Sequence, residues 1–343
     1  QQAVIPAAAQ PGVAGRHILI IKLGALGDVM LALPLIEQLL RHHEGERVTL
    51  LTAPPWRELL LSFPGLEVVT FERRGTGNMA RLLNWLLRQQ FDTVYDLQGS
   101  LRSRIMTLLT QATLRAGPQA SLAYTHAALP SEDVVHAFDR FNAVLTAAGV
   151  TAAVPGLRLS VDEAIQTRVS NWLQRHALAG KPLVLMHAGG SPAWPSKRWP
   201  ERHFLELALA LTEQGLVVVW LGSDAERDMN RRLARTVGVD ATAVFGLTEL
   251  VVLGGHARFV LSNDSGPMHV LALAGVSVYA LFGPTDWRRS HALGQQNNVL
   301  YNPVECSPCH LPVCPPRRAH ACLAGLAPEV VFSRIEADGL LAP

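Results

Sequence analysis

Short apolar runs alternate with amphipathic segments along almost the whole chain. The runs have the length and character of buried strands, and the segments between them repeat apolar residues at helical spacing. Buried strands are predicted at residues 17–23, 47–52, 67–71, 93–97, 183–187, 216–221, 258–261 and 276–282. Because strands that alternate with helices form parallel sheets, the pattern predicts an α/β protein with doubly wound sheets.

The stretch from Ala257 to Asp286 has the pattern of a strand, a helix and a second strand, with a polar break after the first strand. Asp264, Ser265 and Gly266 lie in that break. In an open parallel sheet the loop that leaves a strand faces the ligand crevice, and a helix start presents unpaired N–H groups to an anion. This loop is therefore a candidate phosphate site, although an ordinary helix cap explains Asp264 or Ser265 equally well.

A second loop of this kind follows the first strand, where residues 24–28 have the sequence GALGD. Asp28 lies at the mouth of that strand, either as a functional acid or as a helix cap. A dinucleotide site would need G-x-G-x-x-G and an acidic residue about twenty positions later. Because this loop lacks that spacing and the second strand ends without the acid, a nicotinamide cofactor is disfavoured.

The C-terminal half offers further loops at predicted strand ends. Their glycines permit close backbone approach, and a lysine there can meet a diphosphate. An acid just past a strand end either accepts hydrogen bonds from sugar hydroxyls or caps the next helix. A leucine there either packs against a nucleotide base or fills the core. The candidate residues are Gly189, Gly190, Ser191, Lys197, Asp224, Glu226 and Leu247.

Four arginines of the N-terminal half lie near predicted strand ends. Arginines in such positions are usually solvated, but in a crevice they clamp carboxylates or phosphates bidentately. The residues are Arg73, Arg74, Arg102 and Arg104.

Composition fits two domains of ordinary size. The chain has 343 residues, of which 49% are hydrophobic and 17% charged, enough for a large core. With 30 basic and 28 acidic residues the net charge is +2, which argues against a nucleic-acid-binding protein that relies on a strong basic field.

Residues 1–15 are rich in Ala, Gln, Pro and Gly and lack the basic start and continuous apolar core of a signal peptide. We therefore expect a disordered tail there. The longest apolar run, residues 270–282, is interrupted by Gly275 and is too short to span a bilayer. These features predict a soluble, cytoplasmic protein and leave open a peripheral contact with a membrane surface.

All four cysteines come late in the chain, in the pattern C-x2-C-x4-C-x7-C. In a reducing cytosol such a group favours a structural metal, zinc or iron, but the spacings are irregular for a common zinc module. Free or disulfide-paired thiols stay as the alternative. The candidate ligands are Cys306, Cys309, Cys314 and Cys322.

Taken in order, several segments resemble the ADP-heptose:lipopolysaccharide heptosyltransferases, glycosyltransferase family 9, from about Arg16 onward. They are ILIIKLGALGDVMLALPLI near the start, Lys197-Arg198-Trp199-Pro200, SNDSGPMH from Ser262 to His269, Phe282-Gly283-Pro284-Thr285-Asp286, and the late CSPC with its two further cysteines. The resemblance implies a GT-B fold with two Rossmann-like doubly wound domains that face a central cleft. It implies an acceptor-binding domain at 16–165, a nucleotide-sugar-binding domain at 166–325, and a C-terminal helix and tail at 326–343.

The resemblance also implies an inverting transfer of heptose from ADP-heptose to a lipopolysaccharide core acceptor, with no cofactor required for catalysis. Asp28 looks like the catalytic base and Lys197 like the lysine that meets the donor phosphates. Glu226, with Asp224 as second choice, is similar to the acid that holds the ribose. The residues that match the donor-binding loop are Asp264, Ser265, Gly266 and His269.

Some features depart from the family pattern. Gly189 and Gly190 stand where some members have hydroxyl residues, and the loop 192–196 looks lengthened. The acceptor side matches only loosely, so the four arginines are proposed as acceptor contacts from their positions alone. The alternatives are a GT-B transferase or epimerase that uses another nucleotide sugar, and a nucleotide-sugar-binding protein without turnover. Asp28 argues against a binding protein without turnover, because binding alone requires no base.

Overall fold

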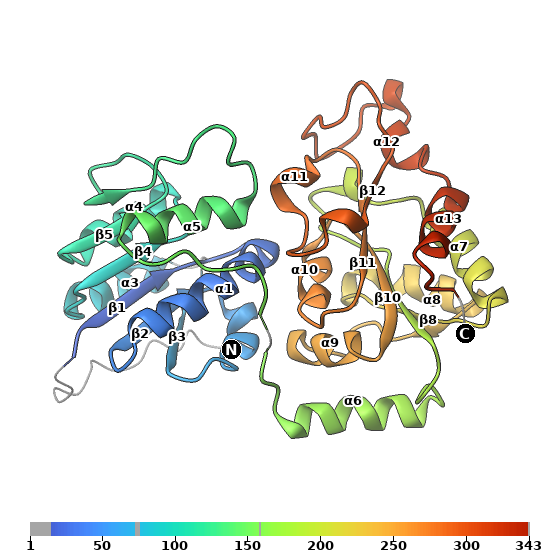
Figure 1. Ribbon diagram of the computed structural model, residues 1–343, viewed down its shortest axis with the longest axis horizontal. Helices are drawn as coiled ribbons and strands as arrows, with labels where there is room; N and C mark the ends of the chain where they lie inside the picture. The colour runs from blue at the N-terminus through green and yellow to red at the C-terminus, as the bar shows by residue number, and fades with distance from the viewer. Residues whose placement is uncertain (1–14, 73–75, 158, 342–343) are drawn as a thin grey trace. The chain divides into compact units, whose positions relative to one another are not determined.

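The computed structural model describes residues 15–72, 76–157 and 159–341 (Figure 1). The chain divides into two compact units, Gln1–Ser160 and Val161–Pro343, here called unit 1 and unit 2. The tail predicted at 1–15 lies almost entirely outside the described residues.

Unit 1 is built on a six-stranded sheet in which every pairing is parallel, in the order β3-β2-β1-β4-β5-β6. Its strands are β1 (His17–Ile21), β2 (Arg47–Thr52), β3 (Leu66–Thr70), β4 (Thr93–Asp96), β5 (Leu114–Gly117) and β6 (His126–Ala127). Its helices are α1 (Leu26–His42), η1 (Pro54–Trp56), α2 (Arg57–Leu60), α3 (Thr76–Arg88), α4 (Leu101–Leu109) and α5 (Ala137–Ala147).

Unit 2 repeats this architecture, with a parallel sheet in the order β12-β11-β10-β7-β8-β9. Its strands are β7 (Leu183–His187), β8 (Val217–Trp220), β9 (Val239–Asp240), β10 (Ala257–Asn263), β11 (Val278–Phe282) and β12 (Val299–Tyr301). The longer helices are α6 (Glu163–Arg175), α7 (Glu201–Glu213), α8 (Arg227–Thr236), α9 (Leu247–Gly254), α10 (Gly266–Ala272) and α13 (Pro328–Ala337). Short helical turns complete the unit: η2 (Pro195–Lys197), η3 (Asp224–Glu226), α11 (Trp287–Ser290), η4 (Gln296–Asn298), η5 (Pro316–Arg318) and α12 (Ala321–Ala324).

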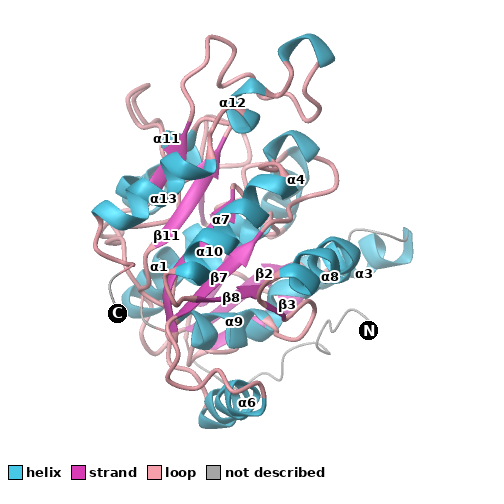
Figure 2. Ribbon diagram, turned by 90° about the vertical axis from the view of Figure 1, so that its right-hand side faces the viewer, coloured by secondary structure: helices cyan, strands magenta, loops and turns pink. Residues whose placement is uncertain are grey.

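The central strands are apolar and buried along their whole length. Every residue of β1 and of β7 is buried, as expected for parallel strands covered by helices on both faces. In unit 2 two separate apolar clusters hold the two faces of the sheet, and α13 packs against α7 on one of them (Figure 1 and Figure 2). The prediction of doubly wound α/β sheets is therefore confirmed.

Both sheets have the strand order of the Rossmann fold, which reverses between β1 and β4 in unit 1 and between β7 and β10 in unit 2. Loops that leave neighbouring strands on either side of such a reversal diverge and leave a crevice at the carboxyl edge. The polar loops singled out from the sequence lie at these two places. Within the described ranges no helix is long and apolar enough to cross a membrane.

Candidate active site

The crevice of unit 1 holds Asp28, which lies in the first turn of α1 with its side chain 46% exposed. The side chain lines a cavity of about 890 Å³ together with residues from α3 and α4. Among the residues that the structure describes, Asp28 is the one acidic residue that lines this cavity. Asp28 is therefore placed to accept a proton from a molecule bound there.

The side chains of Gln98 and Trp56 hold the backbone of the loop before Asp28. Gln98 Oε1 accepts from the backbone N–H groups of Leu23, at 2.9 Å, and Gly24, at 3.2 Å. Trp56 Nε1 donates to the Leu23 carbonyl at 3.3 Å. Because these bonds hold the backbone just ahead of α1, they also set the position from which Asp28 projects.

Of the four arginines proposed as acceptor contacts, Arg102 lines the Asp28 cavity. Its Nη1 atom is shielded from solvent and has no hydrogen-bond partner among the described residues, and an anionic group in the cavity would satisfy it. Arg104 lies on the same helix but not among the lining residues. Arg73 and Arg74 lie outside the described residues.

In unit 2 the fully buried Asn263 ties together the two loops that meet at the strand-order reversal. Its Nδ2 donates to the carbonyls of Ala188 and Gly189, both at 2.9 Å, and its Oδ1 accepts from the backbone N–H of Trp199 at 2.9 Å. The glycine loop after β7 and the turn that carries Lys197 are thus held against the end of β10.

Lys197 and Asp264, predicted separately from the sequence, form an ion pair. Lys197 Nζ lies 2.7 Å from Asp264 Oδ2, and the same oxygen accepts from Thr285 Oγ1 at 2.6 Å. Asp264 is only 6% exposed, whereas the Lys197 side chain is 22% exposed. The ammonium is therefore anchored on its buried side and open on the other, as a site for an anion requires.

The cysteine-bearing segment braces both parts of this ion pair. Ser196, next to Lys197, donates from Oγ to the Leu311 carbonyl at 2.6 Å, and its own carbonyl lies 2.6 Å from His320 Nε2. On the other side Ser307 Oγ donates to the carbonyl of Gly283, in the turn that carries Thr285, at 2.5 Å. The segment therefore fixes the distance between the lysine and threonine that contact Asp264.

Glu226 lies directly against the glycine loop and is 6% exposed. A Cβ atom at residue 189 would come within 2.3 Å of Glu226 Cγ, so only glycine fits there. Glu226 Oε2 accepts from the backbone N–H and the hydroxyl of Ser223, at 2.9 and 2.6 Å. One carboxylate oxygen of Glu226 thus caps η3. Helix capping was the alternative to sugar binding that the sequence left open for this residue. Burial also lowers the pKa of nearby His187 to about 4, with Glu226 acting in the opposite direction.

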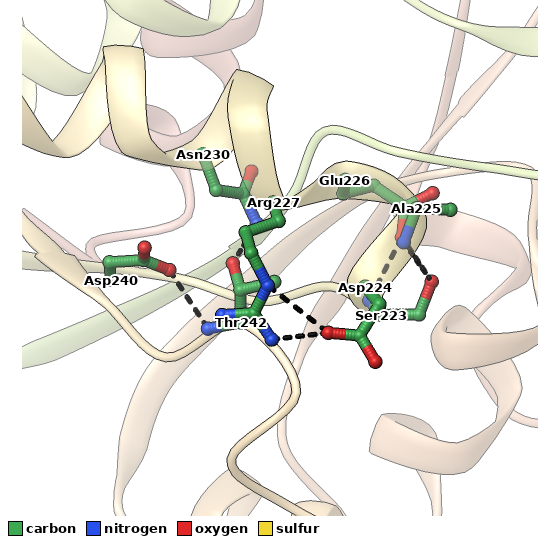
Figure 3. A network of polar contacts seen from close by, with 8 residues as sticks. All are labelled: Ser223, Asp224, Ala225, Glu226, Arg227, Asn230, Asp240 and Thr242. Carbon is green, nitrogen blue, oxygen red and sulfur yellow. Dashed lines mark hydrogen bonds and ion pairs between the residues drawn. The ribbon is translucent and has the colours of Figure 1, made fainter.

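Asp224 has a different environment, shown in Figure 3. Its side chain is 80% exposed and pairs with Arg227 of the same turn, whose Nε lies 3.1 Å from Asp224 Oδ1. Behind it, Asn230 Nδ2 donates to Thr242 Oγ1 at 2.8 Å and so connects α8 to the segment after β9. Asp224 is therefore a surface acid already neutralised locally, and the choice of Glu226 as ribose ligand stays a prediction.

The other predicted donor residues lie at the same edge of the unit 2 sheet. The Gly190 carbonyl accepts from Arg198 Nη2 at 2.7 Å, Ser191 is exposed, and Leu247 is the half-buried first residue of α9. Their positions are compatible with contacts to a nucleotide but do not by themselves identify one.

The loop after Asp264 opens α10 at Gly266. Ser265 Oγ lies 3.2 Å from His187 Nδ1, and His269 is buried on the same short helix. Because α10 has seven residues, its dipole is weak. Lys197 and Arg198, whose Nη2 donates to the Gly190 carbonyl, supply positive side-chain charge at this edge of the sheet.

Comparison with known proteins identifies the family to which the chain belongs. The sequence model of glycosyltransferase family 9 (heptosyltransferase) matches residues 79–320. The chain belongs to glycosyltransferase family 9. It is 28% identical to lipopolysaccharide heptosyltransferase 1 of Pseudomonas aeruginosa, with 95% of this chain and 99% of that protein covered.

Solved structures agree with the fold of this family. A family 9 glycosyltransferase from Veillonella parvula superimposes with a TM-score of 0.80 at 23% identity, covering 96% of this chain and 98% of that one. The ADP-heptose lps heptosyltransferase II of Escherichia coli gives 0.74 at 21% identity, with 95% and 98% covered. The protein is thus a glycosyltransferase with the two Rossmann-like units of the GT-B fold.

A structural metal at the four cysteines stays a prediction. In the ranges that the structure describes, no group of three or more His, Cys, Asp or Glu side chains is placed to hold a metal ion. The four cysteines are free thiols, and burial together with the charges of the other three raises the pKa of Cys322. Hydrogen bonds to the Ser196 and Gly283 loops hold the segment in place.

Several residues with a role in the geometry escaped the sequence reasoning. Asn263, Thr285 and Gln98 are polar residues within or beside the quoted motifs, but their partners come from distant segments. No role was predicted for Lys22, because it lies inside an apolar strand motif. A lysine next to a buried apolar strand is itself a signal, because a lysine is rarely buried without a partner.

Proposed function

We propose that the protein transfers heptose from ADP-heptose to a lipopolysaccharide core acceptor with inversion of configuration. The observation that carries this proposal is the half-open ion pair of Lys197 and Asp264 at the strand-order reversal of unit 2. It supplies a fixed cation for a diphosphate at the place where Rossmann-like sheets bind nucleotides. The names of the relatives compared above support ADP-heptose as the donor and lipopolysaccharide as the acceptor.

On the donor side, Lys197 meets the diphosphate and stabilises the charge that develops as ADP leaves. Asp264 and Thr285 keep the ammonium in place, so no reorganisation is needed during the reaction. Glu226 accepts from the ribose through the oxygen that does not cap η3, and Leu247 lies against the adenine. We expect catalysis without a metal ion, because the lysine performs the charge stabilisation that a metal would otherwise supply.

On the acceptor side, the cavity of unit 1 binds the anionic sugar of the lipopolysaccharide core. Arg102 contacts an acidic group of that sugar through its shielded Nη1. Asp28 then takes the proton of the attacking hydroxyl as the new glycosidic bond forms and the bond to ADP breaks. A single displacement of this kind inverts the anomeric carbon, so one base is sufficient.

We also propose that the reaction takes place in the cytoplasm with a peripheral contact at the inner membrane, made by α4. Leu101, Ile105 and Leu108 of this helix are 67%, 48% and 45% exposed, a spacing that places them on one face. Flotation with vesicles of phosphatidylglycerol and phosphatidylethanolamine tests this: Leu108→Asp, outside the cavity lining, should float less than the native protein, and equal flotation would exclude α4.

The proposed activity is tested by incubation with ADP-heptose and a heptose-free lipopolysaccharide core. We expect one ADP released for each heptose added to the acceptor, no release without acceptor, and a product anomer opposite to that of the donor. Release of ADP from another nucleotide sugar only, or conversion of the donor without acceptor, would favour the alternative transferase or epimerase. Binding of ADP-heptose without any turnover would favour a binding protein.

A further inference from the structure

Lys22, the residue after β1, has a completely enclosed side chain with three defined contacts. Its Nζ donates to the Leu97 carbonyl at 3.0 Å, lies 3.9 Å from Asp28 Oδ2, and lies 3.8 Å from the centroid of the Phe141 ring. The side chain is 1% exposed. The ammonium is thus fixed by a carbonyl, a carboxylate and an aromatic face.

The composition makes this position unusual. Only three of the 30 basic residues of the chain are lysines: Lys22, Lys181 and Lys197. Lys181 is exposed, whereas Lys197 forms the proposed phosphate contact. A second lysine that is buried beside a functional carboxylate, in a chain that otherwise uses arginine, indicates a role that needs a compact ammonium.

Burial of this cation opposes folding, so the structure must compensate for it. Burial lowers the pKa of Lys22 to about 8, and the carboxylates of Asp28 on α1 and Asp96 at the end of β4 act in the opposite direction. Within the described part of the chain, Asp28 and Asp96 are the charged groups that act on the ammonium. Asp96 itself accepts from Tyr124 and from the Gln98 and Gly99 N–H groups.

Asp28 needs such a partner because its side chain is otherwise half exposed. The position of a base must be held to within a fraction of an ångström for efficient proton transfer. An ammonium below the carboxylate fixes Oδ2 and leaves the other oxygen free for the acceptor.

We propose that Lys22 is a positioning residue that holds the ionised carboxylate of Asp28 toward the acceptor cavity. The proposal rests on the proposed function for its catalytic part, whereas the coupling between the two side chains is independent of it. Neutralisation of the lysine at alkaline pH then releases the base, so transfer declines above about pH 8.

The first test measures the coupling without any turnover. The side-chain carbon signals of three lysines are readily distinguished by NMR, and Lys22→Met identifies the signal of Lys22. In Asp28→Asn the titration of Lys22 should move downward by about half to one pH unit, because the favourable charge is gone. An unchanged titration would overturn the proposal, whatever the protein catalyses.

The second test measures catalysis in Lys22→Met, Lys22→Arg and the exposed control Lys181→Met. In Lys22→Met we expect kcat to fall about ten- to a hundredfold, with the KM for ADP-heptose nearly unchanged because the proposed donor residues lie in unit 2. In Lys22→Arg we expect partial recovery and loss of the decline near pH 8, because arginine stays charged. Native kcat in Lys22→Met would overturn the positioning role, whereas an inactive native protein with a normal Lys22 titration shift would count against the proposed function alone.

Discussion

The ion pair of Lys197 and Asp264 can be separated into a structural and a ligand-binding part by a double-mutant cycle. Loss of one partner of a buried pair costs about 3–5 kcal/mol. Because Lys197 is 22% exposed and Thr285 still bonds Asp264, we expect Lys197→Met to lose about 1–3 kcal/mol of unfolding free energy. Adding Asp264→Asn removes the uncompensated charge, so the double variant should regain most of that loss.

Donor binding should behave differently from stability. A hydrogen bond to a charged group contributes about 1.5–3 kcal/mol, which corresponds to a loss of about ten- to a hundredfold in ADP affinity for Lys197→Met. The double variant should not regain it, because the cation itself is missing. Urea unfolding and ADP titration calorimetry on the four proteins of the cycle measure both quantities. An unchanged ADP affinity in Lys197→Met would refute the role of Lys197 as phosphate ligand. A double variant that regains ADP affinity together with stability would refute it as well.

Three further perturbations test the same unit. Gly189→Ala should lower the melting temperature and weaken ADP binding, because the new Cβ would lie 2.3 Å from Glu226 Cγ; a fully native variant in both assays would show that the close approach is unimportant. Ser196→Ala removes the 2.6 Å bond to Leu311 and should raise the KM for the donor several-fold with a smaller change in stability; a pure stability loss would contradict the brace. For His187 the folded pKa is lowered from 6.5 to about 4, so the unfolded state binds more protons between these values and unfolding free energy should fall as pH drops from about 6.5 to 4. Equilibrium unfolding should show a weaker pH dependence in His187→Gln, and the same dependence in both proteins would assign it to other groups.

The architecture was predictable because parallel strands leave an unambiguous pattern. The apolar runs at β1, β7 and β10 are buried on both faces, and their alternation with helices is sufficient to indicate doubly wound sheets. The strands β5, β6, β9 and β12 were not predicted, because strands of two to four residues carry little periodicity. The positions of Asp28, Lys197 and Asp264 in loops and turns at strand ends were also predicted from the sequence, and their chemical roles stay predictions.

Side-chain pairing was less predictable than position. Nothing in the sequence indicates that Lys197 binds Asp264 across 67 residues, or that Lys22 lies under Asp28, because these distances depend on how neighbouring strands are packed. The hydrogen bonds that brace the cysteine segment, made by residues such as Ser307 and His320, were also not predicted from the sequence. The metal site at the cysteines stays a prediction.

The central claim, that Asp28 is the base of an acceptor-dependent heptosyl transfer, is tested most directly by ADP release from ADP-heptose in native protein and in Asp28→Asn. We predict acceptor-dependent release by the native protein, a fall of about a hundredfold or more in the variant, and unchanged ADP binding, because the donor residues lie in unit 2. Turnover in Asp28→Asn close to the native rate would contradict the account.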